Sequence, residues 1–101
     1  MTAVRLVYYV TDPFLDARQP IAALVAGVGG IVVVRAPGTD LPASARANVD
    51  RVLRDLEDAV TLDPLPLGAG AQVVGGATLT APVPAAEAPA WASRALADRA
   101  A

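Results

Sequence analysis

The sequence predicts a small α/β domain, built as a two-layer sandwich of three or four strands with helices on at least one face. Residues 4–10 and 31–35 are rich in β-branched and aromatic side chains, which favour strands. Residues 45–60 carry apolar side chains at steps of three and four, which is typical of an amphipathic helix. A chain of 101 residues can close one hydrophobic core, so we expect a single domain over residues 1–101.

The first strand covers residues 4–10. Its apolar side chains follow one another almost without a break, which favours a strand covered on both faces. The strand ends at Thr11-Asp12-Pro13, because proline cannot donate a hydrogen bond to the next strand and aspartate favours a turn.

Residues 20–26 are expected to form a short helix. Pro20 suits a first helical turn and Gly27 suits the residue after a helix end. A strand is the competing interpretation, since six of these residues are apolar with no clean period. A helix between two strands would make those strands a parallel pair joined by a right-handed β-α-β crossover.

The second predicted strand is Ile31 to Arg35, in which four consecutive residues are β-branched. Ala36-Pro37-Gly38 follows as a turn signal. The glycine-rich residues 27–30 precede this strand, whereas phosphate-binding loops follow a strand and open a helix. We therefore assign these glycines, and those at 68–70, to turns and connections.

The long helix begins near Thr39 or Asp40, either of which can cap it, with Pro42 in its first turn. Its apolar stripe consists of Ala45, Val49, Val52, Leu53, Leu56 and Val60. The opposite face is charged and offers pairs four residues apart, such as Asp50 with Arg54. Each such pair contributes only about 0.2–0.5 kcal/mol, so this face is expected to be solvated.

The last third of the chain begins with a loop at residues 61–71. Residues 72–74 and 78–80 flank Gly75-Gly76, and form either a tight hairpin or one bulged strand. A linker rich in proline and alanine, residues 80–89, leads to a C-terminal helix at 89–100.

Composition excludes several chemistries. The chain has no cysteine and no histidine, which removes thiolate nucleophiles, imidazole bases, disulfides and the usual zinc ligands. The carboxylates outside the long helix (Asp12, Asp16, Asp40, Asp63 and Glu87) have no spacing typical of a catalytic pair or a metal site. We therefore expect no metal and no cofactor, we assign no catalytic residue, and an enzyme is the less favoured class.

Charge and hydropathy limit the partners. The net charge is −2 and the arginines are scattered, which argues against nucleic acid as a partner. The longest apolar stretch, residues 21–34, is interrupted by glycines and is shorter than a membrane span. The first residues lack the layout of a signal peptide. We therefore expect a soluble cytoplasmic protein with no membrane partner.

One candidate ligand site depends on the predicted parallel strands. Asp12 and Arg35 each follow a strand, and ligands of open α/β sheets bind at the carboxyl ends of strands. Together with Arg18, these side chains are predicted to hold a small polar ligand. In the alternative, Asp12 caps a turn and Arg35 pairs with it on the surface.

A candidate docking surface lies on the C-terminal helix, where Trp91 and Leu96 share one side. An amphipathic helix on a flexible tether can dock into a groove of a partner. In the alternative, Trp91 anchors this helix to the core of its own chain.

Two classes of function follow. The first is a small non-enzymatic interaction or accessory protein, such as a subunit or an antitoxin-like or immunity-like partner, that binds another protein or assembles with itself. The alternative is a small-molecule-binding domain or minimal enzyme that uses Asp12, Arg18 and Arg35.

Overall fold

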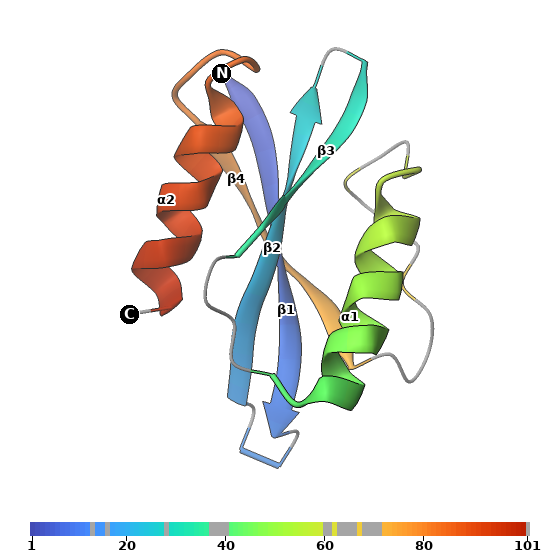
Figure 1. The fold of residues 1–101 in the computed structure, drawn as a ribbon. Coiled ribbons are helices and arrows are strands. Elements are labelled where there is room, and N and C mark those ends of the chain that lie inside the picture. Colours follow the sequence, from blue (N-terminus) through green and yellow to red (C-terminus); the bar gives the residue numbers. More distant parts are fainter. Residues whose placement is uncertain are drawn as a thin grey trace.

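The computed structural model describes residues 1–12, 14–15, 17–27, 29–36, 41–59, 62, 67 and 72–100. Its elements are β1 (Thr2–Asp12), β2 (Ala17–Gly27), β3 (Gly30–Arg35), α1 (Ala43–Leu56), β4 (Val73–Ala81) and α2 (Ala88–Ala100). The four strands form one sheet in the order β3-β2-β1-β4, and every neighbouring pair is antiparallel. The two helices lie on opposite sides of this sheet (Figure 1).

The two central strands are covered on both faces, which the apolar run of residues 4–10 predicted for β1. In β2, all residues from Ile21 to Val25 are buried. Successive side chains of a strand point to opposite faces. Leu24 therefore packs against α1, whereas Val25 packs on the side of α2. In β1, Val7 belongs to the first of these clusters and Leu6 to the second.

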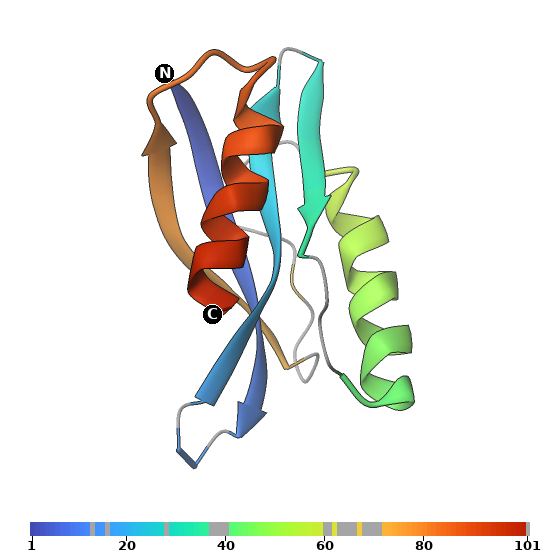
Figure 2. The same ribbon diagram turned by 60° about the vertical axis from the view of Figure 1, so that its left-hand side comes forward.

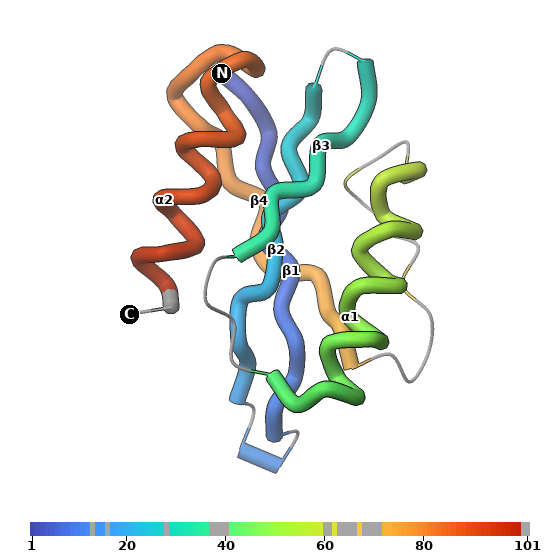
Figure 3. The backbone as a smooth tube through the Cα atoms, viewed as in Figure 1, coloured from blue at the N-terminus to red at the C-terminus, as the bar shows by residue number. Residues whose placement is uncertain are grey.

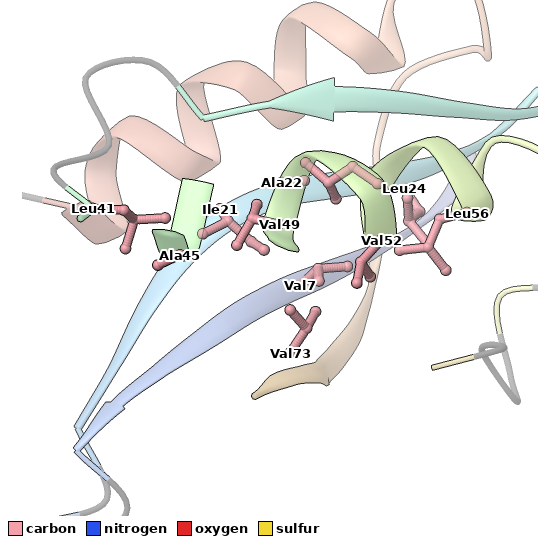
Figure 4. Close-up of a cluster of buried hydrophobic side chains, with 11 residues drawn as sticks. Val7, Ile21, Ala22, Leu24, Leu41, Ala45, Val49, Val52, Leu56 and Val73 are labelled. Carbon is pink, nitrogen blue, oxygen red and sulfur yellow. The ribbon is translucent and has the colours of Figure 1, made fainter. Parts of the chain in front are cut away.

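Helix α1 closes one half of the core (Figure 4). Its buried residues are Ala45, Val49, Val52, Leu53 and Leu56. These are the predicted stripe up to Leu56, and that part of the prediction is confirmed. The predicted capping residues, Thr39 and Asp40, and the last stripe residue, Val60, lie outside the described residues.

Helix α2 closes the other half of the core. Its buried residues are Ala88, Ala92 and Leu96, which meet Val4, Leu6, Ala23, Val25 and Ala81 of the sheet. The preceding segment is tied to the sheet, because the Thr2 hydroxyl donates a hydrogen bond of 2.9 Å to the Val83 carbonyl oxygen. With a helix on each face, the domain has three layers, and the predicted two-layer sandwich is wrong.

The predicted short helix at residues 20–26 is also wrong, and the competing strand interpretation is confirmed. These residues lie in β2, where both faces are covered, so their apolar side chains show no period of two. Pro20 lies opposite Tyr8, next to an irregularity in the register of β1 and β2. The ladder between β2 and β3 starts at Ala22, so the missing N–H of Pro20 interrupts no hydrogen bond to β3.

The predicted β-α-β start is therefore absent, and so is its parallel pair. Strands β1 and β2 are joined by the four residues between Asp12 and Ala17. Such a short connection forms a hairpin, because a parallel crossover needs a dozen residues or more. The next connection is shorter still, since Gly27 pairs directly with Gly30.

Of the two alternatives predicted for residues 72–80, the structure shows the single bulged strand, which is part of β4. Its register against β1 shifts by one residue between the pairs Arg5–Thr78 and Val7–Gly75. The bulge brings side chains of β1 close to two glycines: a Cβ atom on Gly76 would overlap the ring of Tyr8, and one on Gly75 would lie 2.5 Å from the guanidinium of Arg5, which is the mobile end of a long side chain. The two glycines therefore let β4 pass close to the side chains of β1.

Candidate functional site

The hairpin of β1 and β2 extends beyond the rest of the fold. Both strands have 11 residues, whereas β3 has six and pairs with the half of β2 that begins at Ala22. The far half of the hairpin passes the C-terminal end of α2, and its end extends past α1, as the two ribbon views and the tube view show (Figures 1, 2 and 3).

The end of this hairpin exposes two large apolar side chains, Phe14 at 96% and Leu15 at 78%. One carboxylate oxygen of Asp12, Oδ1, accepts hydrogen bonds from the backbone amides of Phe14 at 3.0 Å and Leu15 at 3.3 Å. This aspartate turn fixes the backbone that carries both side chains. Asp12 therefore caps the turn, as the alternative interpretation of this residue predicted. We call Asp12, Phe14 and Leu15 the hairpin tip.

The predicted ligand residues are not brought together. Strands β1 and β3 run in the same direction on either side of β2, so Asp12 and Arg35 do end toward the same end of the sheet. However, Asp12 lies opposite Ala17, whereas Arg35 lies opposite Ala22. Five residues of a strand separate these levels, or roughly 17 Å. Arg18 is an exposed residue of β2 opposite Val10, on the projecting part of the hairpin.

Arg35 has another partner. Its guanidinium forms an ion pair of 2.9 Å with Asp50 of α1, and Asp50 forms a second ion pair of 2.9 Å with Arg54. The sequence predicted the pair within the helix but not the one between β3 and α1. The expectation that Arg35 pairs with Asp12 on the surface is wrong.

An open groove of about 490 Å³ lies between the end of β3 and α1. Apolar side chains line it, namely Ile21, Leu41, Val49 and Leu53, together with the polar side chains of Arg35, Arg46 and Asp50. Arg46 is held by a hydrogen bond of 2.9 Å from its Nε to the Leu41 carbonyl oxygen. Of the three predicted ligand residues, the groove includes Arg35.

Trp91 and Leu96 belong to the contact between α2 and the sheet. Leu96 is fully buried, and Trp91 is partly buried against the same cluster. A partner would reach Leu96 only if α2 left the sheet. The anchoring alternative describes the folded chain, although a shallow groove at Trp91, Leu79 and Asp98 leaves part of the indole accessible.

Phe14 and Leu15 were not among the predicted site residues. The signal was present, because two large apolar residues stand in a turn between a proline and an aspartate, where polar residues are usual. Their exposure depends on the length of the hairpin of β1 and β2. Because residues 20–26 were predicted to be a helix, no hairpin was expected there.

Comparison with family models, with curated protein sequences and with solved structures finds no match to this chain. Within the described parts of the chain, no three acidic side chains lie close enough together to hold a metal ion. Neither of the two described helices has the length and hydropathy that crossing a bilayer requires.

Proposed function

We propose that the chain is a small interaction protein that inserts its hairpin tip into an apolar cleft of a protein partner. The exposure of Phe14 and Leu15 at the projecting end of a long hairpin carries this proposal. Single exposed apolar residues are ordinary on protein surfaces. Here two of them are adjacent, project beyond the remaining elements, and are carried on a turn that Asp12 holds.

The energetics support such a contact. Full burial of a Phe or Leu side chain is worth about 1.5–3 kcal/mol, so the tip can contribute a large part of a binding free energy. The hydrogen bonds from the amides of Phe14 and Leu15 to Asp12 reduce the backbone entropy that these two residues lose on binding. A compact apolar tip fits a concave apolar site, so we expect a cleft and not a flat polar surface on the partner.

The test compares partner binding by three forms of the chain, each tagged and purified gently from its own host. The first is the natural chain, the second carries Phe14→Ser and Leu15→Ser, and the third carries Val32→Thr. Val32 is the matched control, because it is also an exposed apolar residue, at 44%, but it lies in β3. Native mass spectrometry reports whether a second polypeptide accompanies each form, and circular dichroism confirms that each is folded.

We expect the natural chain and Val32→Thr to carry the same second polypeptide, and the tip variant to lose it. The tip variant should remain folded, since Phe14 and Leu15 lie outside both core clusters. Equal recovery with the tip variant would contradict the proposal. Absence of a second polypeptide from all three forms would contradict it as well.

A small-molecule-binding domain is the second candidate, and the groove of about 490 Å³ favours it. Arg35 and Arg46 beside an apolar floor suit a small ligand with one carboxylate or phosphate and an apolar body. A panel of such compounds should raise the melting temperature of the natural chain but not of Arg46→Ala. No shift with any compound would remove this candidate. Asp12 and Arg18 do not line the groove, so Asp12→Asn should leave any shift intact.

The remaining expectations stay predictions. These are the cytoplasmic location, the absence of a nucleic-acid partner and the use of Trp91 as a docking residue. The other predicted partner was a second copy of the chain, and the edges of the sheet are the surfaces through which two copies could pair.

A further inference from the structure

We propose that two copies of the chain pair through the outer edges of their β3 strands and form one continuous antiparallel sheet. This inference goes beyond the proposed function and does not depend on it, because β3 and the hairpin tip are separate surfaces. Edge strands present unpaired backbone donors and acceptors, and so can add a strand from another chain.

The sheet has two edges, and they differ. Strand β4 carries a bulge at one edge, and bulges are a usual protection against pairing between chains. Strand β3, at the other edge, pairs with β2 without any irregularity over its six residues. Four of its six residues are β-branched, and its one charged residue, Arg35, stands at its end. The edge at β3 is therefore the one suited to pairing.

The backbone groups available on this edge follow from the register. The Ala36 amide donates to the Ile21 carbonyl oxygen at 2.8 Å, just beyond the paired residues Arg35 and Ala22. Hydrogen-bonded and non-bonded pairs alternate along an antiparallel ladder, so the even-numbered residues of β3 bond to β2. The backbone N–H and C=O groups of Ile31, Val33 and Arg35 consequently point outward. Within the described part of the chain, these outward groups make no backbone hydrogen bond.

The surroundings leave this edge open. In Figure 1, β3 is the strand nearest the viewer, with α2 on one side of the sheet and α1 on the other. Figure 2 shows β3 at the rim of the sheet from a second direction. In Figure 1 no helix lies in front of β3, so a strand from a second copy can approach from the side of the viewer; in Figure 2, α1 appears beyond β3.

If a two-fold axis passes through Val33, the outward backbone groups of β3 match those of β3 in the second copy. Val33 then lies opposite Val33 of the second copy, and Ile31 lies opposite Arg35 of the second copy. All three outward-facing residues find a partner, which gives six backbone hydrogen bonds between the copies, two for each pair. Residues directly opposite have Cβ atoms about 4.5–5.5 Å apart, so Arg35 of the second copy comes close to Ile31.

Charge favours a second copy as the occupant. Ile31 and Val33 pack on the α1 side of the sheet, and Arg35 reaches α1 on that same side. Arg35 of the second copy therefore enters a groove of about 510 Å³ that Ile31, Val32, Glu57 and Asp58 line. This places a guanidinium beside two carboxylates at each end of the interface. Asp50 keeps its ion pair with Arg54 when Arg35 turns to the other copy.

The first experiment measures the mass of the natural chain by sedimentation and native mass spectrometry over a concentration series. We expect twice the subunit mass of 10.2 kDa. Val33→Pro removes the central outward N–H without touching the ladder to β2 and should raise the dimer dissociation constant by roughly tenfold to a hundredfold. Val33→Ala is the matched control: it removes the same side chain but keeps the N–H, and should stay dimeric.

The second experiment tests the register by charge exchange. In the Arg35→Glu variant, the new glutamate of one copy lies beside Glu57 and Asp58 of the other copy. In the double variant Glu57→Arg/Asp58→Arg, the two new arginines lie beside Arg35 of the other copy. Like charges therefore meet in both cases, and each variant should form a weaker dimer with itself. Mixed together, they place opposite charges at both ends of the interface. The mixed dimer should therefore form at least about tenfold more tightly than either variant dimer at low salt.

Three results would overturn the proposal. One is a natural chain that stays monomeric at every concentration, and another is a dimer that Val33→Pro and Val33→Ala affect equally. The third is a mixture that shows no preference for the mixed dimer. Circular dichroism and thermal melting show that each variant is folded. The tip variant Phe14→Ser/Leu15→Ser should remain dimeric, which separates failure of the dimer from failure of tip docking.

Discussion

The guanidinium of Arg35 at the end of β3 and the carboxylate of Asp50 in the middle of α1 lie 2.9 Å apart. This contact joins an edge strand to the helix that covers one face of the sheet. Within the single chain it directs the side chain of Arg35 toward α1, where Arg35 lines the groove between the two elements.

We expect the Arg35–Asp50 ion pair to contribute little to stability. The side chains of Arg35 and Asp50 are 47% and 39% exposed, and exposed ion pairs are typically worth less than about 1 kcal/mol. Asp50→Asn should therefore lower the free energy of unfolding by less than about 1 kcal/mol relative to Asp55→Asn, an exposed site on the same helix. The difference should shrink at high salt. Urea denaturation at two salt concentrations measures both effects, and a loss above about 2 kcal/mol would contradict this view.

Asp12 offers a test that separates a structural role from a ligand-binding one. Its Oδ1 caps two amides of the hairpin tip, and asparagine keeps a carbonyl oxygen in that place. Asp12→Asn should leave stability and partner binding close to those of the natural chain. Asp12→Ala should lower the free energy of unfolding by about 1 kcal/mol and weaken partner binding. If Asp12→Asn is as damaging as Asp12→Ala, the charge itself matters and the capping role is insufficient.

We expect a substitution of Gly76, at the bulge in β4, to lower the stability of the domain. A Cβ atom at Gly76 would overlap the Tyr8 ring and lie 3.3 Å from the Leu6 carbonyl oxygen, so the Tyr8 side chain must shift and the backbone at Leu6 must give slightly. Gly76→Ala should cost about 1–3 kcal/mol of stability, as overpacking usually does. Gly29→Ala is the control, because no atom lies within 4 Å of its added Cβ. It should be neutral or slightly stabilising. Thermal denaturation of both variants gives the comparison, and equal melting temperatures would show that the bulge has room.

The sequence could predict those elements whose pattern is local. The stripe of α1 has a period of its own, and so its buried residues up to Leu56 were predictable. The strand over residues 4–10 and the strand at Ile31 to Arg35 were predictable from β-branched and aromatic content. In each case the residues that decide the structure are neighbours in the chain.

Residues 20–26 could not be predicted in this way. A segment buried on both faces is uniformly apolar, and a short apolar run has no period that separates helix from strand. Pro20 and Gly27 then matched the ends of a helix equally well. This error led to two others. A helix at residues 20–26 implies that the strands on either side of it are parallel, and the ligand site at Asp12 and Arg35 was predicted from those parallel strands. The observed hairpin depends on pairing with β1, which is not a local property.

The last prediction concerns α2, which the sequence offered as a docking element. Leu96 is fully buried against Val4, Leu6 and Val25, so the helix is a structural layer of the domain. Leu96→Ala should therefore lower the free energy of unfolding by about 2–5 kcal/mol, through lost burial and the cavity it leaves. Leu15→Ala removes the same side-chain atoms from an exposed site and should change stability by less than about 0.5 kcal/mol.

Trp91 supplies the measurement for this comparison, since it is the single tryptophan of the chain and packs against the same cluster as Leu96. Its fluorescence should follow the unfolding of the whole domain, with one transition that coincides with loss of the circular dichroism signal. Leu96→Ala should move that transition to lower urea, and Leu15→Ala should not. A fluorescence transition that precedes the loss of sheet signal would mean that α2 leaves the sheet separately, and would restore Trp91 and Leu96 as a docking surface.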